Sequence, residues 1–220
     1  MITSKTQDDV MCKILKKIQG MTAEELLAEY WPENTVPVDI KEILNRIGIS
    51  YQKDDFKVLN DAEYIKKMAD KRGGKLLGVV FADKDFLNIF YKQNKCEGMS
   101  ESELTSAQNR ARFTLAHELA HCVNNTHEVE SGNYDGLFLD FRFSDDKDII
   151  DIDTYKNEHK LEYEANIFAG EILIPKNRLL EILTEMPEIS INLLKDYFKV
   201  SENAMKGRLK YLGINLGGAE

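Results

Sequence analysis

The chain of 220 residues contains little cysteine and little proline, and it has no long apolar run. Its three cysteines, Cys12, Cys96 and Cys122, are scattered and form no CxxC pair. This pattern argues against a disulfide framework and against a zinc site built from thiolates. No run reaches the roughly 18 to 20 apolar residues that a membrane helix needs, and the N-terminal stretch does not resemble a secretory signal. We therefore expect a cytoplasmic protein that does not associate with membranes.

The overall composition is that of a folded protein. Hydrophobic residues make up 43% of the chain and charged residues 30%, which argues against extensive intrinsic disorder. The length suits one buried core, or one domain with a small appendage. The formal net charge of -9 disfavours nonspecific binding of nucleic acid, because phosphate contacts dominate that affinity.

Apolar spacing and turn residues predict an α+β fold in which helices pack on a small β-sheet. In the first half we expect helices over 10–30, broken near Gly20, and over 38–47, closed by Gly48, and then a hairpin of 76–81 and 86–91 around the turn 82–85. In the second half we expect a long helix after a capping box at Ser100–Glu103, a second hairpin within 130–155, a helix over 156–171, and short helices over 177–183, 191–198 and 202–212.

Residues 117–121 read His-Glu-Leu-Ala-His. On a helix, His117 and His121 lie one turn apart on the same face, where both imidazoles can bind one metal ion. Glu118 is turned by about 100° from His117, so its carboxylate can act on the attacking water without being a ligand. This zincin pattern lies inside the longest helix that the sequence predicts. It favours a catalytic Zn²⁺ site, with Glu118 as the general base, over two surface histidines beside a solvated glutamate.

The motif supplies two protein ligands, so the third must come from another part of the chain. A catalytic zinc typically has three protein ligands and one open position. By residue type, the candidates are His127, His159 and the segment 162–166, which contains two glutamates. The residue types alone do not choose among these candidates.

Several segments together resemble the ImmA/IrrE family of zinc metallopeptidases. They are Arg112–His121 (RFTLAHELAH), Glu162–Ala169 (EYEANIFA), Ile172–Pro175 (ILIP) and, at the C-terminal end, Phe198–Ile214. The similarity runs from Leu76 to about Asn215. It implies a zincin-like catalytic domain and a Zn²⁺-dependent endopeptidase. The implied substrate is a helix-turn-helix repressor or an antitoxin-like protein of a mobile element, a prophage or a stress regulon.

Glu162 is the predicted third ligand within the second segment of this resemblance. Helix residues two apart point about 200° away from each other, so Glu162 and Glu164 cannot both face the metal. Asn166 lies one turn beyond Glu162 on the same face, where a second-shell amide could hydrogen-bond a ligand or orient a histidine. We therefore predict a metal set of His117, His121 and Glu162 with Asn166 behind it, and an exposed Glu164.

The chain is expected to divide into an N-terminal helical segment of the catalytic domain (1–75), a zincin-like core (76–175) and a C-terminal helical module (176–220). Basic residues outnumber acidic ones among the charged side chains of 191–212, as in a DNA-binding helix-turn-helix. Because the whole protein is acidic, we favour a helical module that packs on the catalytic domain, although DNA binding through this segment stays open.

Other features stay open at this level. Tyr155, Tyr163 and His159 lie near the second motif, and each could stabilise the oxyanion of the reaction. The strand 86–91 could pair with an extended substrate or be an ordinary core strand. The segment 130–155 is expected to form a hairpin or an ordered flap near the metal. A function of a different class is a non-proteolytic, metal-containing regulator that binds a repressor or DNA.

Overall fold

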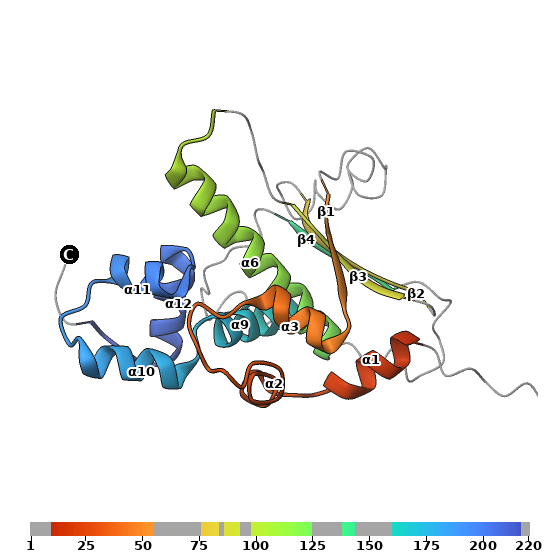
Figure 1. Ribbon diagram of the computed structural model, residues 1–220, viewed down its shortest axis with the longest axis horizontal. Coiled ribbons are helices and arrows are strands. Elements are labelled where there is room, and N and C mark those ends of the chain that lie inside the picture. Colours follow the sequence, from red (N-terminus) through yellow and green to blue (C-terminus); the bar gives the residue numbers. More distant parts are fainter. Residues whose placement is uncertain are drawn as a thin grey trace, which may run out of the picture.

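The computed structural model describes residues 10–54, 76–83, 86–92, 98–124, 138–143 and 160–216, and these form an α+β fold (Figure 1). The helices are α1 (Val10–Ile18), α2 (Ala23–Tyr30), α3 (Ile40–Ile47), α6 (Glu101–Asn124), α9 (Lys160–Leu173), α10 (Lys176–Glu185), α11 (Ile191–Phe198) and α12 (Glu202–Tyr211). The strands are β1 (Ser50–Lys53), β2 (Leu76–Asp83), β3 (Phe86–Tyr91) and β4 (Phe138–Phe143). The fold class is the one that the sequence predicted.

The described strands form one mixed sheet in the order β1-β3-β2-β4. β2 and β3 pair antiparallel, with Val80 opposite Ile89, which confirms the first predicted hairpin. β1, which the sequence analysis did not predict, adds to β3 in parallel. β4 lies within the predicted second hairpin and pairs antiparallel with β2. The remainder of 130–155 lies outside the described residues.

The place of β3 corrects one expectation about the substrate. β3 lies between β1 and β2, so Asn88–Tyr91 have main-chain partners on both sides. Addition of a peptide strand needs an open sheet edge, and an extended substrate therefore cannot pair with this part of β3. The other interpretation is correct, since Leu87, Ile89 and Tyr91 are buried core residues.

Several helices begin or end at the glycines and capping residues from which the sequence analysis predicted their boundaries. Gly20 (φ 65°) separates α1 from α2, and Gly48 (φ 97°) closes α3, both in the left-handed region that glycine adopts without strain. Before α6, the Ser100 backbone N–H donates to Glu103 over 2.8 Å, and the Glu103 N–H donates to Ser100 Oγ over 3.3 Å. The predicted capping box is confirmed.

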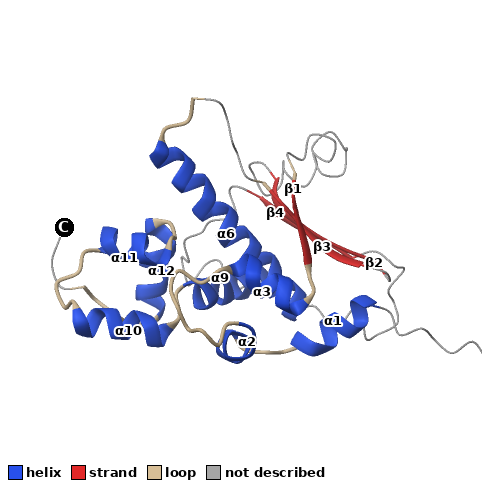
Figure 2. Cartoon of the chain, in the orientation of Figure 1, coloured by secondary structure: helices blue, strands red, loops and turns tan. Residues whose placement is uncertain are grey.

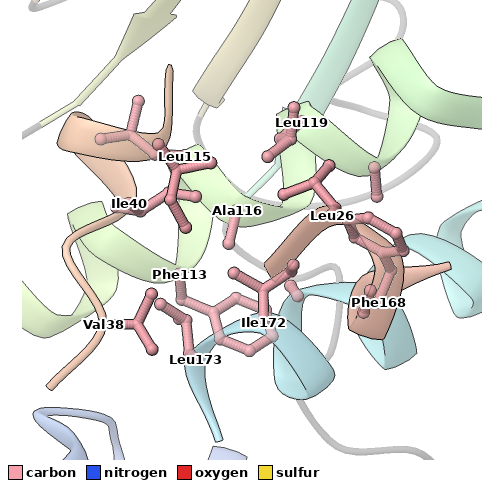
Figure 3. Close-up of a cluster of buried hydrophobic side chains, with 14 of the residues drawn as sticks. Leu26, Val38, Ile40, Phe113, Leu115, Ala116, Leu119, Phe168, Ile172 and Leu173 are labelled. Atoms are coloured by element: carbon pink, nitrogen blue, oxygen red, sulfur yellow. The ribbon is translucent and has the colours of Figure 1, made fainter. Parts of the chain in front are cut away.

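α6 is the central helix of the fold. It contacts the sheet on one side and α9 on the other (Figure 2). Figure 3 shows Leu26 of α2, Leu115 of α6, and Phe168 and Ile172 of α9 in the buried cluster around it. α6 has 24 residues, but no helix in the described part of the chain is both long enough and apolar enough to cross a membrane.

The C-terminal helices pack on the rest of the molecule through α12 and α9. Arg208, one of the basic residues that suggested a DNA-binding surface, is buried instead and pairs with Glu171 of α9 over 3.1 Å. Its Nε–H also donates to the Ile174 carbonyl over 3.2 Å. Phe198 and Leu209 belong to the same buried cluster as the rest of the core.

Candidate metal centre

The C-terminal half of α6 brings the histidine motif into the interior. Every residue from Phe113 to Val123 is buried, and the exposed fractions of His117, Glu118 and His121 are 0%, 0% and 3%. Such burial is costly for polar side chains unless each finds a partner. Glu162 and Asn166 on α9 are among the partners of the histidines.

Small side chains let α9 approach α6 closely. Ala116 and Ala120 on α6, and Ala165 and Ala169 on α9, are fully buried. The separation of packed helices depends on the side chains at their contact, and alanines permit a short one. Glu162, in the first turn of α9, can therefore reach the histidines of α6.

The structure brings His117, His121 and Glu162 together. The two histidine Nε2 atoms are 3.0 Å apart, and the Glu162 carboxylate oxygens lie 3.2 Å from His117 Nε2 and 3.6 Å from His121 Nε2. One ligand atom from each residue lies within 4.8 Å of the others. The resulting triad is buried, since Glu162 is only 7% exposed.

The donor set fits zinc in type and in spacing. Two imidazole nitrogens and one carboxylate oxygen are a ligand set of catalytic zinc sites. Tetrahedral ligands at about 2.0–2.1 Å from one ion stand about 3.3–3.4 Å apart. The histidine nitrogens are 3.0 Å apart, and the two Glu162 oxygens lie 3.2 and 3.6 Å from them, which is near that value. The site is therefore a His-His-Glu metal site consistent with zinc.

Asn166 lies behind His117, one turn along α9 from Glu162. Its Oδ1 is 2.9 Å from His117 Nδ1, and Asn166 itself is buried. Because an amide oxygen only accepts, this contact favours the tautomer with the proton on Nδ1. That tautomer leaves Nε2, which faces Glu162, free of a proton and able to bind a metal ion.

Glu164 lies away from the triad. Its side chain is 43% exposed and forms an ion pair of 3.6 Å with Lys160, one turn earlier on α9. Among the other sequence candidates, Tyr163 lies on α9 with its phenol pKa raised by burial. His127, Tyr155 and His159 lie outside the described residues.

Gly78 on β2 is a site residue that the sequence analysis missed. A Cβ built on it would lie 2.6 Å from Thr114 Cγ2 and 3.0 Å from Glu118 Cδ, and closer still to Glu118 Oε1. Only glycine therefore lets β2 pass this close to the Glu118 carboxylate. The available signal is a glycine within the apolar strand run LLGVVF, because such a glycine often marks a close backbone approach.

We expect Asn166→Ala to weaken zinc binding about 10- to 100-fold, the usual range for a lost second-shell partner of a metal ligand. Asn166→Asp should keep zinc, because it retains an oxygen acceptor for His117 Nδ1–H. Competition with a chromophoric chelator measures both affinities, and Asn203→Ala on the exposed face of α12 is the control. Equal zinc affinity in Asn166→Ala and the wild type would contradict the orienting role.

The HExxH arrangement on a long helix packed against a small mixed sheet, with a second glutamate supplied by the neighbouring helix, defines a metallopeptidase of the zincin class. Residues 103–210 match the family model of the IrrE N-terminal-like domain. The chain thus carries a domain of this zinc metallopeptidase family, which confirms the resemblance seen in the sequence. Comparisons with curated proteins and with solved structures give no match.

Proposed function

We propose that the protein is a cytoplasmic zinc endopeptidase that cleaves a helix-turn-helix repressor or an antitoxin-like protein. The proposed peptidase activity rests on the buried triad and on Glu118, which follows His117 directly on α6. The substrate class rests on the family resemblance. A peptidase domain implies a protein substrate, and a DNA-binding repressor is the substrate that the resemblance implies.

In this proposal His117, His121 and Glu162 hold the ion, and Asn166 fixes the orientation of the His117 ring. Zinc, when bound, lowers the pKa of a coordinated water toward about 7 and polarises the carbonyl of the scissile peptide. The protein contributes a rigid, buried donor set. Its histidine rings are already turned toward each other, with centroids 4.7 Å apart in an edge-on arrangement.

Glu118 is the proposed general base and general acid. Its carboxylate takes a proton from the attacking water and then delivers it to the amine of the leaving peptide. Because Glu118 follows His117 directly on α6, it is next to the donor set without being part of it. The backbone of β2 at Gly78 closes one side of the carboxylate and limits where it can move.

We expect Gly78→Ala to reduce kcat on the order of 10²-fold, because small misplacements of a catalytic group have effects of this size. The added methyl group must displace Glu118 or Thr114. Zinc content should stay at one ion per chain, since the side chains that the methyl group meets, Glu118 and Thr114, are not part of the triad. Steady-state kinetics with parallel metal analysis tests this.

The control for that variant is Gly207→Ala on α12, where an added Cβ meets nothing within 4 Å. It should keep wild-type kinetics. Overpacking at residue 78 also costs about 1–3 kcal/mol of stability, so the assay temperature must lie well below the Tm of the variant. Unchanged kcat in a folded Gly78→Ala protein would contradict the positioning argument.

The proposed substrate class is tested by incubating the zinc-loaded protein with helix-turn-helix repressors from the same genome. We expect one defined cut by mass spectrometry, its loss with a chelator and its return with zinc. Cleavage of an unfolded generic protein without cleavage of any repressor would retain the peptidase and reject the substrate class. No cleavage of any of these proteins would count against the peptidase itself.

The burial of the site favours a second candidate function. His117 and Glu118 have no exposed surface, whereas a peptidase must admit a peptide to its metal. A metal-containing regulator that binds a repressor or DNA without cutting needs no such access. The two functions differ in whether Glu118 is needed, and this is the basis of the first experiment in the Discussion.

A further inference from the structure

A polar hollow lies on the side of α6 that faces away from the metal centre. It has a volume of about 570 Å³ and is formed by α3 and the residues just before it, the end of β1, the first half of α6 and the turn between α11 and α12. Arg112, which lines it, is turned by about 140° around the helix axis from His117. The hollow is therefore separate from the metal centre.

The lining of this hollow is positively charged, in a protein of net charge -9. Its cations are Lys41, Lys53, Arg112 and Lys199, and Asp39 is the acidic residue among those that line it. The Asp39 carboxylate is engaged at the start of α3, where it accepts from the backbone N–H groups of Lys41 (3.0 Å) and Glu42 (3.4 Å). Within the described part of the chain, none of the four cations forms an ion pair.

Two of these cations are held in place. Arg112 donates to the carbonyls of Phe198 (3.0 Å), Lys199 and Val38 (2.6 Å). Three hydrogen bonds leave two of the five N–H donors of a guanidinium available. Burial lowers the pKa of Arg112 to about 10, so it stays charged near neutral pH. The Lys41 ammonium lies over the rings of Tyr51 and Tyr91, 5.6 and 5.4 Å from their centroids.

We propose that this hollow binds a small, multiply charged phosphate-bearing ligand. Its volume lies within the range of about 300–1,000 Å³ that is typical of small-molecule sites. Four cations around one hollow match a compact anion better than carboxylates spaced along a peptide. A guanidinium with free N–H donors and lysine ammonium groups are the side chains that bind phosphate oxygens. Thr105, Gln108 and Asn109 add polar groups to the same wall.

The test is calorimetric titration of the zinc-loaded full chain with inorganic pyrophosphate. We expect saturable binding at one site per chain that weakens as NaCl is raised, because the attraction is electrostatic. The double variant Lys53→Gln with Lys199→Asn should bind at least about tenfold more weakly, since it removes two of the four charges. Asparagine suits position 199, where the backbone is left-handed (φ 53°).

The matched control is Lys176→Gln with Lys210→Gln, which removes the same charge from exposed positions away from the hollow. It should bind pyrophosphate as the wild type does, and zinc content is measured before and after each titration. Equal affinity in the hollow variant and the wild type would place the anion elsewhere, including at the zinc, and overturn the proposal. Absence of saturation, or tighter binding of a polyglutamate peptide, would overturn it as well.

Discussion

Glu118→Gln should slow cleavage of the substrate severely while the protein keeps one zinc ion per chain. Glutamine has the size of glutamate, so the close approach of the side chain to Gly78 is retained. Its neutral amide cannot take a proton from water, and general acid–base catalysis contributes about 10²- to 10⁴-fold. We therefore expect cleavage to fall by about 10³-fold, measured by mass spectrometry of timed digests and by metal analysis.

The control for this experiment is Glu164→Gln, which removes an exposed carboxylate from α9 and should cleave at the wild-type rate. The same pair of variants separates the two candidate functions. If Glu118→Gln still relieves repression in cells while it binds zinc and cuts nothing, the protein is a regulator that works without proteolysis. If cleavage in vitro and relief of repression are lost together, proteolysis is the function.

The sequence predicts those parts of the fold that are determined by residues close together in the chain. Gly48 ends α3 because glycine adopts a φ of 97° without strain, and Ser100 with Glu103 marks the start of α6. These signals act over a few residues. The same holds for the hairpin of β2 and β3, whose partners are joined by a short turn.

The missed features depend on partners far away in the chain. β1 is four residues long and mostly exposed, and it pairs in parallel with β3 some 38 residues later, as in Ser50 opposite Asn88. No periodicity of its own identifies it. β4 has a strand-like sequence, but its partner β2 lies about 60 residues earlier in the chain, as in Val80 opposite Asp140. Strand composition predicts a strand and does not choose its neighbour.

The candidate site also contains residues that the sequence predicts and residues that it does not. His117, Glu118 and His121 are recognisable because one helix turn brings them together. Glu162 and Asn166 follow from helix geometry on α9, once the resemblance has indicated that segment. Gly78 and Arg112 have their roles only through contacts with α6 and with the turn at Lys199, respectively. The glycine in LLGVVF signals a close backbone approach without naming its partner, and no local pattern predicts the contacts of Arg112.

Glu162→Ala should remove most of the zinc, whereas Glu164→Ala should keep it at one ion per chain. Glu162 supplies the carboxylate that stands 3.2 and 3.6 Å from the two histidine nitrogens. Without it two imidazoles remain, fewer than the three protein ligands of a catalytic zinc site. Alanine is the best helix former, so α9 should persist in both variants, as circular dichroism would report.

The two variants are matched, because each removes one negative charge from α9 and the positions are two residues apart. They differ in what the carboxylate touches. Glu162 is 7% exposed and faces the histidines, while Glu164 pairs with Lys160 at the surface, where such a pair contributes about 0–1 kcal/mol. Stoichiometric zinc in Glu162→Ala after dialysis, with loss in Glu164→Ala, would mean that the metal binds on a different face of α9. Equal loss in both would point to a general electrostatic effect of α9 rather than to a ligand.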